Sequence, residues 1–300
     1  MTDSRPAVAV IVLNFNKKAE LLACLDSVRV LDYAPFHVVV VDNGSADGSA
    51  DAVAERFPDY HLIRNETNLG ACQGRNIGAT FAADHLSAGY LLFLDDDTIL
   101  DPRFLDHVMR ALVADPGAAI ATGKAYTAYP STTIMSAGVV ANFTTGSVYD
   151  LGTGETDGGQ FDEAREIDAC GGFGFLIRAE VYRRLNGMDL VFTPYGWEDI
   201  DLCLRARQAS HRCLYVPEAV IYHSGGKIGR GPLEAYERHK ARNFMILLWR
   251  HTNLWQKITC PAVIALRELK NVVVLIFQGQ FRIIVSRFRG LFDFLSQPRP

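Results

Sequence analysis

Two clusters of acidic side chains have the residue types and spacing from which chemistry can be expected. Asp95–Asp97 follow the apolar run 90–94, and the pair Glu198–Asp199 comes about a hundred residues later. Carboxylates this close together repel one another unless they share a cation, and carboxylate oxygens are ligands that suit Mg²⁺ and Mn²⁺. The first cluster therefore predicts a divalent-metal site, and the second offers a candidate general base.

The first hundred residues predict the elements that position these clusters. Short apolar runs alternate with segments of helical period, which is typical of βαβ units and a mostly parallel sheet. The expected strands are residues 7–13, 38–41, 60–64 and 90–94, and the expected helices are 18–29, 48–57 and 71–85. Ligands of open α/β sheets bind beyond the carboxyl ends of the strands. Asn14, Asp42 and Asp95 all lie at such ends, so we expect them at one rim.

The pattern is weaker after residue 117. The expected strands are residues 118–124, 134–140, 168–178, 213–216 and 219–223, and the expected helices are 178–185 and 198–209. An aromatic loop, residues 192–197, leads into the second of these helices. We expect a catalytic domain over residues 1–232 and a helical extension over residues 233–300.

Composition and charge point to an enzyme with an unusual tail. A chain of 300 residues with 49% hydrophobic residues can bury a substantial core. The six cysteines form no CxxC pair and no signal peptide precedes the first apolar run, so we expect a cytoplasmic protein with reduced thiols. Residues 1–229 hold 18 Lys and Arg against 30 Asp and Glu, whereas residues 230–300 hold 12 against 4. No nucleic-acid partner is expected.

The basic tail is expected to form a helical stretch over residues 261–294. Its longest charge-free segment, 271–281, is far shorter than the roughly 20 apolar residues that span a bilayer. Two interpretations stay open. The stretch can lie on the inner face of the cell membrane as a peripheral contact, or it can pack on the catalytic domain or on a second subunit of a homodimer. Its apolar residues are interspersed with basic ones: Leu266, Leu269, Val273, Ile276, Ile284 and Phe288 with Arg267, Lys270, Arg282, Arg287 and Arg289.

Five segments resemble, in the same order, the motifs of the inverting family 2 glycosyltransferases, which use nucleotide-diphospho-sugars. The segments are Val10–Asn16, Val41–Ser49, Asn68–Gly70 with Arg75–Gly78, Phe93–Thr98 and Trp197–Arg205. The resemblance covers about residues 6–250 and is strongest to bacterial rhamnosyltransferases and galactofuranosyltransferases. It implies an α/β GT-A fold, with a mixed, mostly parallel central sheet flanked by helices and followed by a C-terminal helical extension. The implied donor is dTDP-rhamnose or a UDP-sugar, and the implied acceptor is a cell-surface glycan or a lipid-linked saccharide.

The resemblance implies a set of residues for the nucleotide-sugar. Asp42 would accept a hydrogen bond from the imide N–H of uracil or thymine. Residues 42–45 also form an ordinary turn sequence, and the glycines at 70, 74 and 78 equally suit close helix packing. Gly171–Gly172 equally suit a tight turn. The remaining implied contacts are Asn14, Asn16, Asn43, Asn68, Gly70, Arg75, Asp95, Asp96 and Gly172.

The resemblance also implies a metal site. Asp97 matches the second acidic residue of the family's Asp-x-Asp motif and would bind Mn²⁺ or Mg²⁺ together with Asp95 and His223. Such a cation stabilises the negative charge that grows on a diphosphate leaving group. A histidine that is only hydrogen-bonded at a strand end is the alternative for His223. Asp96 occupies the variable middle position, so the division of roles within the triplet stays open.

The second acidic cluster implies the general base. Asp199 is expected to remove a proton from the acceptor hydroxyl, and Glu198 is its rival. Either carboxylate can instead stabilise the start of a helix. Tyr195 and Trp197 are expected to stack on the acceptor sugar, with core packing as the alternative for Trp197.

Two other classes of protein compete with this interpretation. A Rossmann-type NAD-dependent oxidoreductase requires GxGxxG after the first strand, and residues 14–19 do not provide it. A P-loop phosphotransferase fails similarly, because GxxxxGK[ST] is absent from the sequence. The non-enzymatic alternative is a catalytically silent, sugar- or lipid-binding GT-A scaffold. The joint presence of Asp42, Asp95, Asp97, Asp199 and His223 argues against it.

Overall fold

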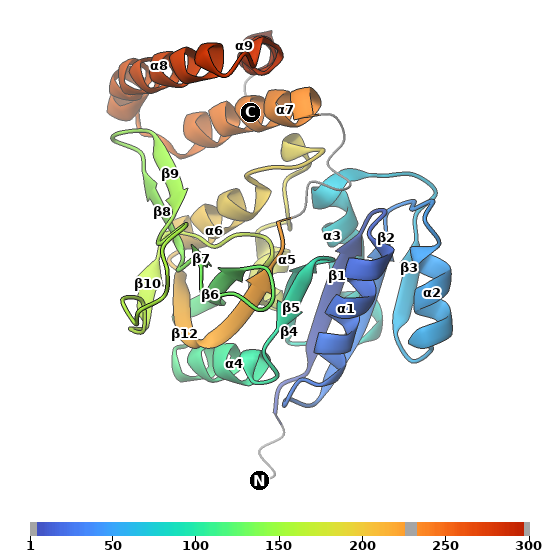
Figure 1. The fold of residues 1–300 in the computed structure, drawn as a ribbon. Helices are drawn as coiled ribbons and strands as arrows, with labels where there is room; N and C mark the ends of the chain where they lie inside the picture. Colours follow the sequence, from blue (N-terminus) through green and yellow to red (C-terminus); the bar gives the residue numbers. More distant parts are fainter. Residues whose placement is uncertain (1–4, 226–232, 297–300) are drawn as a thin grey trace.

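A central β-sheet with helices on both faces forms the body of the molecule (Figure 1). The computed structural model describes residues 5–225 and 233–296. The sheet has the strand order β10-β12-β6-β11-β4-β1-β2-β3. It is mixed and mostly parallel, as expected, because β11 and β10 are the antiparallel members of this path.

The first half of the chain forms the elements that the apolar runs predict. The strands are β1 (Val8–Asn14), β2 (Phe36–Asp42), β3 (His61–Arg64) and β4 (Tyr90–Asp95). The predicted helices are α1 (Lys18–Arg29), α2 (Ser49–Arg56) and α3 (Gly70–His85). A further helix, α4 (Phe104–Ala114), was not predicted. Alternation along β1 buries Val8, Val10 and Val12 with α1 and α4, and Ala9 and Ile11 with α3.

Strand register brings the polar strand ends to one rim. Asn14 pairs with Asp42 across β1 and β2, and Leu13 pairs with Asp95 across β1 and β4. After β4 the chain turns into β5 (Thr98–Leu100), which runs antiparallel to the end of β12 (Arg212–His223). In that pairing His223 lies opposite Thr98. The carboxyl ends of β1, β2 and β4 and the end of β12 therefore meet.

The second half departs from the expected strands at several places. The remaining strands are β6 (Ala118–Thr127), β7 (Ile134–Ser136), β8 (Val139–Asn142), β9 (Ser147–Asp150), β10 (Arg165–Ile167) and β11 (Gly174–Arg178). The single strand expected over 134–140 is wrong, because Gly138 has a φ of +97° and divides it. The strand expected over 168–178 is wrong in its first half, since only β11 is extended there. The β8–β9 hairpin was not predicted.

The two strands expected at 213–216 and 219–223 are one strand, β12, with a register shift between Val216 and Val220. Pro217 lacks an N–H group and is tolerated at such an irregularity. On the neighbouring strand Gly123 permits the close approach, since a Cβ there would lie 1.8 Å from the Ala219 carbonyl oxygen. The bulge therefore bends β12 without ending it.

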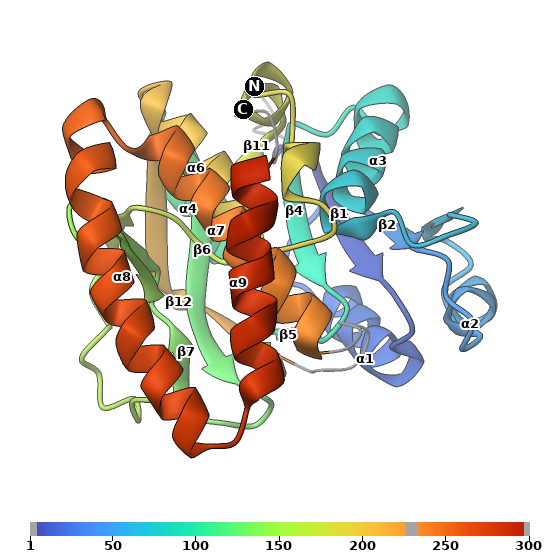
Figure 2. The ribbon, with the colours of Figure 1, turned by 90° about the horizontal axis from the view of Figure 1, so that it is seen from above.

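The helices of the second half include a helical layer outside the sheet. Within the body lie α5 (Ala179–Arg184), the 3₁₀ helix η1 (Leu190–Phe192) and α6 (Glu198–Gln208). The tail contains α7 (Leu233–His251), α8 (Leu254–Phe277) and α9 (Phe281–Ser296), and Figure 2 shows α8 and α9 lying across the molecule. The helical stretch expected over 261–294 is present as two helices, because Gly279 with a φ of +68° separates α8 from α9. Among the helices described, none combines the length and the hydropathy that crossing a membrane needs.

Asp201 joins α6 to α7. Its buried carboxylate accepts hydrogen bonds from Arg205 Nε at 2.7 Å and Arg250 Nη1 at 3.1 Å, and lies 2.9 Å from His251 Nε2. Burial raises its pKa, but the hydrogen bond from His251 and the charge of Arg205 outweigh burial, so the net pKa is lowered. The tail is thus anchored to the helix that begins with Glu198. The division of the chain into domains at residue 232 stays a prediction.

Replacing Asp201 by asparagine is expected to lower the free energy of unfolding by about 3 kcal/mol, because the partly buried cations Arg205 and Arg250 lose a buried counter-ion. Urea denaturation at pH 7 measures the loss. The folded pKa is depressed, so the contribution is complete above the unfolded value of about 3.9 and is lost as the pH falls through the folded value. Glu180→Gln, which removes an exposed pair with Arg184, is the control and should change stability by less than about 0.5 kcal/mol. Equal effects of both variants would contradict the anchoring role.

Candidate active site

Asp95, Asp97 and His223 form a compact cluster at the rim of the sheet. His223 Nε2 lies 2.9 Å from Asp97 Oδ1 and 3.6 Å from Asp95 Oδ2. One ligand atom of each residue lies within 4.8 Å of the other two. Asp97 and His223 are buried, whereas the Asp95 side chain keeps 34% exposure. Two carboxylates and an imidazole fit Mn²⁺ or Mg²⁺, and the exposed side at Asp95 leaves room for substrate oxygens.

Asp96 faces away from this cluster toward the loop after β1. Its Oδ1 lies 3.0 Å from Lys17 Nζ, and its Oδ2 accepts a hydrogen bond from the Phe15 N–H at 3.2 Å. Lys17 also lies 2.9 Å from Asp97 Oδ2. Asp97 is thus held on both sides, by Lys17 at one oxygen and His223 at the other. No motif in the sequence singled out Lys17, although it directly follows the Asn14–Asn16 segment.

Burial and neighbouring charges shift the pKa values of Asp96 and Asp97 in opposite directions. Burial raises the pKa of Asp96 to about 7, although Lys17 opposes the shift. Burial also acts upward on Asp97, but the hydrogen bond and charge of His223 and the charge of Lys17 outweigh it and lower the net pKa. Of Asp96 and Asp97, it is therefore Asp97 that stays ionised over the wider pH range.

Arg75 of α3 connects the two acidic clusters. Its side chain is only 4% exposed, and Nη1 donates a hydrogen bond to Glu198 Oε1 at 3.1 Å. Nη2 donates to the Gly172 carbonyl oxygen at 3.1 Å and also bonds to Asp95. The expected small-residue segment at Gly172 thus lies between the guanidinium and the base motif.

Glu198 and Asp199 begin α6 but have different surroundings. Glu198 is buried against Arg75, whereas Asp199 is half-buried and its Oδ1 accepts the Ile200 N–H at 2.8 Å. Burial, and then the charge of Glu198, raises the pKa of Asp199 well above its usual range, and Arg75 opposes the shift. A Cβ on Gly172 would lie 3.2 Å from Asp199 Oδ2. Glycine at 172 therefore leaves the space in front of this carboxylate.

The asparagines expected to border the donor hold the rim loops together. Asn14 Nδ2 donates to Asp42 Oδ1 at 2.7 Å, and Asp42 Oδ2 accepts the Ser45 N–H at 3.0 Å. Asn16 Oδ1 accepts the Ala46 N–H at 2.8 Å. On the other side of β2, Asn43 Nδ2 donates to Asn68 Oδ1 at 3.0 Å and to the Gly70 carbonyl oxygen at 3.2 Å. The structure therefore brings all these predicted residues to one end of β1 and β2.

The glycines of α3 serve close packing, which is one of the two readings that the sequence left open. A Cβ at Gly74 would lie 2.4 Å from Leu13 Cδ1, and one at Gly78 would lie 2.5 Å from Ile11 Cγ2. Gly70 has a φ of +83°, and its Cβ would meet the Pro194 carbonyl oxygen at 2.8 Å. Small residues at these positions let α3 carry Arg75 directly above the end of β1.

The aromatic loop packs on α7. Trp197 Nε1 donates to the Lys240 carbonyl oxygen at 3.0 Å, and its ring lies 4.9 Å from Phe244. Tyr195 stacks on Tyr236 at 5.5 Å. Packing therefore accounts for much of the environment of both rings.

A residue that the sequence analysis missed holds this loop in place. The buried Asn243 of α7 donates from Nδ2 to the Phe192 carbonyl oxygen at 2.6 Å and to the Tyr195 carbonyl oxygen at 2.9 Å. A buried asparagine in a helix carries no motif, so no sequence signal separates it from a surface asparagine. The tail thus shapes the loop that leads into the base motif.

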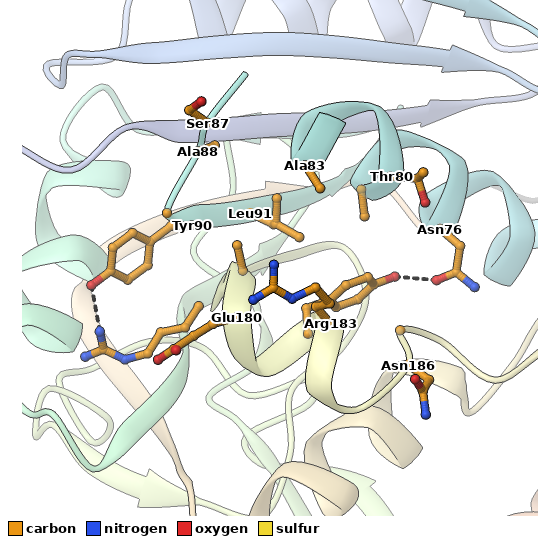
Figure 3. Close-up of a pocket in the computed structure, with 16 residues that line it drawn as sticks. Asn76, Thr80, Ala83, Ser87, Ala88, Tyr90, Leu91, Glu180, Arg183 and Asn186 are labelled. Atoms are coloured by element: carbon orange, nitrogen blue, oxygen red, sulfur yellow. Dashed lines mark hydrogen bonds between the residues drawn. The ribbon is translucent and has the colours of Figure 1, made fainter. Parts of the chain in front are cut away.

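A cavity of about 700 Å³ lies elsewhere, between α3, α5 and the start of β4 (Figure 3). Its polar groups bond to one another: the Tyr182 hydroxyl donates to Asn76 Oδ1 at 2.5 Å, and Arg178 Nη1 donates to the Tyr90 hydroxyl at 2.8 Å. Tyr90 and Asp95 are the two ends of β4. The cavity is therefore at the opposite end of that strand from the acidic clusters.

This fold and this rim define a glycosyltransferase of the GT-A class. The model of the family described as "Glycosyltransferase like family 2" matches residues 6–245, and the chain belongs to this family. An N-acetylglucosaminyl-diphospho-decaprenol L-rhamnosyltransferase of Mycobacterium tuberculosis is 26% identical over 283 residues, which cover 85% of this chain and 88% of the relative. An uncharacterised glycosyltransferase of Haemophilus influenzae is 35% identical over 109 residues, which cover 36% of this chain and 35% of the relative.

Solved structures share the fold at low sequence identity. The mannosyltransferase PcManGT from Pyrobaculum calidifontis, in complex with GDP-Man and Mn²⁺, superposes with a TM-score of 0.61 at 18% identity, covering 97% of this chain and 88% of that one. GalNAc-T7 with UDP, GalNAc and Mn²⁺ superposes with a TM-score of 0.62 at 14% identity, covering 82% of this chain and 48% of that one. The expected family, fold class and enzyme class are thus confirmed.

Proposed function

We propose that this glycosyltransferase is metal-dependent and inverting, and that it moves a sugar from a pyrimidine nucleotide-diphospho-sugar to a hydroxyl of a cell-surface glycan or lipid-linked saccharide. The observation that carries the proposal is Arg75, which bonds both to Asp95 of the cluster Asp95, Asp97 and His223 and to Glu198, the neighbour of Asp199. A cation site and a base beside one another are what transfer from a diphosphate donor requires.

The acidic cluster serves the leaving group. A divalent cation, Mn²⁺ or Mg²⁺, would be held by Asp95, Asp97 and His223 and would supply positive charge to the departing diphosphate. Lys17 and His223 hold Asp97 between them at 2.9 Å each. The carboxylate is therefore oriented before substrate arrives.

Asp199 serves as the general base. It takes the proton of the acceptor hydroxyl while that oxygen bonds to the anomeric carbon and the bond from this carbon to the diphosphate breaks. Attack from the face opposite the diphosphate inverts the anomeric configuration. Glu198 is the poorer candidate, because it is buried and hydrogen-bonded to Arg75. Its role is to hold Arg75 between the two clusters.

The polar residues at the rim and the names of the relatives support the proposed identities of the donor and the acceptor. Asp42, held by Asn14 and Ser45, faces the imide N–H of a pyrimidine, with Asn16, Asn43, Asn68, Gly70, Asp96 and Gly172 around the donor. The rhamnosyltransferase relative supports dTDP-rhamnose as the first donor to test and a UDP-sugar as the second. The diphospho-decaprenol in the name of that relative supports a lipid-linked saccharide as the acceptor. The inner face of the cell membrane as its location is part of our proposal. Tyr195 and Trp197 border the acceptor.

A panel of nucleotide-sugars tests the proposal. With Mn²⁺ present, dTDP-rhamnose or a UDP-sugar should raise the melting temperature by several degrees, since ligand at 100 times its Kd stabilises a protein by about 2.7 kcal/mol. The same donor should release nucleoside diphosphate when an acceptor saccharide is added. Asp42→Ala should remove the preference for pyrimidines. Stabilisation without release would favour the silent scaffold, and a shift only with purine donors would overturn the assignment of Asp42.

A further inference from the structure

Helices α8 and α9 present a large apolar surface to solvent. Trp255, Leu266 and Phe277 on α8 and Phe281, Phe288 and Phe292 on α9 are each 59–88% exposed. We call the surface that these six residues mark the α8–α9 face. Figure 1 shows both helices as the outermost layer, beyond α7. Most large hydrophobic side chains that are exposed in the described ranges lie on this pair. Contiguous apolar surface of this kind marks an interaction site.

The sequence of α9 shows that the exposure is built into the helix. The stripe Ser286, Gly290 and Phe294 is buried, and Gly290 packs so closely that a Cβ would lie 2.2 Å from the Arg238 carbonyl oxygen of α7. The apolar stripe that contains Phe288 and Phe292 lies on the outer side. A surface helix normally turns its apolar stripe inward. Here α9 buries Ser286, Gly290 and Phe294 and exposes Phe288 and Phe292.

Helix α8 is arranged in the same way. Its inner side contacts the β8–β9 turn, where Arg267 Nη1 donates to the Gly146 carbonyl oxygen at 2.9 Å and Cys260 bonds to the Phe143 carbonyl oxygen. The outer side carries Leu266, Leu269 and Phe277, all more than 60% exposed. Both helices are therefore attached to the body by one side, and the large side chains named on the other side are mostly exposed to solvent.

Unpaired positive charge surrounds the α8–α9 face. Lys270 and Arg289 are exposed, and within residues 5–225 and 233–296 no carboxylate lies at ion-pair distance from either. The carboxylates of the two helices are already paired, Asp293 with Arg238 at 2.6 Å and Glu268 with Arg287 at 3.4 Å. A second copy placed symmetrically on this face would bring the same cations together. An anionic lipid surface offers apolar chains and negative headgroups at once.

We propose that the α8–α9 face docks on the surface of an anionic lipid bilayer, with both helices in the headgroup region and parallel to the membrane plane. This docking deepens the proposed function and rests on it, because its purpose is to reach the proposed lipid-linked acceptor. Helix α7 lies between this face and the aromatic loop, and its Asn243 holds that loop next to the base motif. Docking therefore brings the acceptor side of the rim toward the membrane on which a lipid-linked saccharide is held.

Vesicle flotation with the full chain tests the docking. The chain should float with phosphatidylglycerol-containing vesicles and much less with pure phosphatidylcholine, and rising salt should release it. Phe288→Asp with Phe292→Asp should weaken binding by at least tenfold, and Lys270→Gln with Arg289→Gln should abolish the preference for anionic lipid. Val113→Ser, which removes a side chain of 56% exposure on α4, is the matched control and should float like the wild type.

Three results would overturn the docking: no flotation with anionic vesicles at low salt, flotation that the aspartate variant leaves unchanged, or a stable dimer that the same variant dissociates. Nucleoside diphosphate release with a water-soluble acceptor separates this inference from the proposed function. Diphosphate release without vesicle binding would refute the docking alone, and vesicle binding without release would refute the proposed reaction alone. The aspartate variant should release diphosphate at the wild-type rate with the soluble acceptor.

Discussion

Asp97→Ala is expected to abolish sugar transfer, with a loss of at least about 10³-fold, because positive charge at the leaving group is among the largest contributions to such a reaction. His223→Ala should weaken transfer severely, since its Nε2 lies 2.9 Å from Asp97 Oδ1. EDTA should inactivate the wild type, and Mn²⁺ or Mg²⁺ should restore it. Mn²⁺ binding, measured by electron paramagnetic resonance, should be lost in Asp97→Ala without any substrate present.

The exposed Asp84 of α3 supplies the control for this result. Asp84→Ala removes a carboxylate of the same type from outside the rim, and should keep both Mn²⁺ binding and transfer. Full activity of the wild type in EDTA would show that the acidic cluster acts without a metal. Unchanged Mn²⁺ binding in Asp97→Ala would place the cation elsewhere.

Asp199→Asn is expected to lower turnover by about 10²–10⁴-fold while donor affinity changes little, because the substitution keeps the shape and removes the base. The base must be ionised to accept a proton. Burial and the charge of Glu198 raise the pKa of Asp199, so kcat/KM should rise with pH through a midpoint above the usual aspartate value of about 3.9. The residual activity of Asp199→Asn should lack this rise.

Glu198→Gln distinguishes the two neighbours. The variant weakens the contact with Arg75 and should disturb donor binding as well as turnover, whereas its pH profile should keep the rise assigned to Asp199. If Glu198→Gln instead shows a pure loss of turnover and Asp199→Asn does not, the two roles must be exchanged.

Sequence periodicity was sufficient to predict the site residues that lie at the ends of strands. Asn14, Asp42 and Asp95 end parallel strands, and parallel strands in adjacent register bring their ends together. His223 was also predicted, although it reaches the cluster through the antiparallel pairing of β5 with β12. In these cases the end of a strand can be recognised in the sequence, and the geometry of the sheet then brings the strand ends together.

Contacts made by single side chains across the fold were not predictable. Lys17 reads as a surface lysine until Asp96 and Asp97 are seen on either side of its ammonium group. Asn243 reads as an ordinary helical residue until the carbonyl groups of the aromatic loop surround it. The β8–β9 hairpin and the break at Gly279 were missed because short strands and helix ends depend on tertiary contacts more than on local pattern.

The position of Arg75 has a consequence for how variants of this protein combine. Asp95 and Glu198 come from distant parts of the chain, yet each bonds through one carboxylate oxygen to the guanidinium group of Arg75. When one of these two carboxylates is removed, Arg75 keeps its bond to the other. A second substitution therefore acts on a site that the first substitution has already altered. Energetic effects of residues that share a partner do not add, and coupling between them is of the order of 0.5–3 kcal/mol. The two acidic clusters are thus one epistatic unit rather than two independent halves.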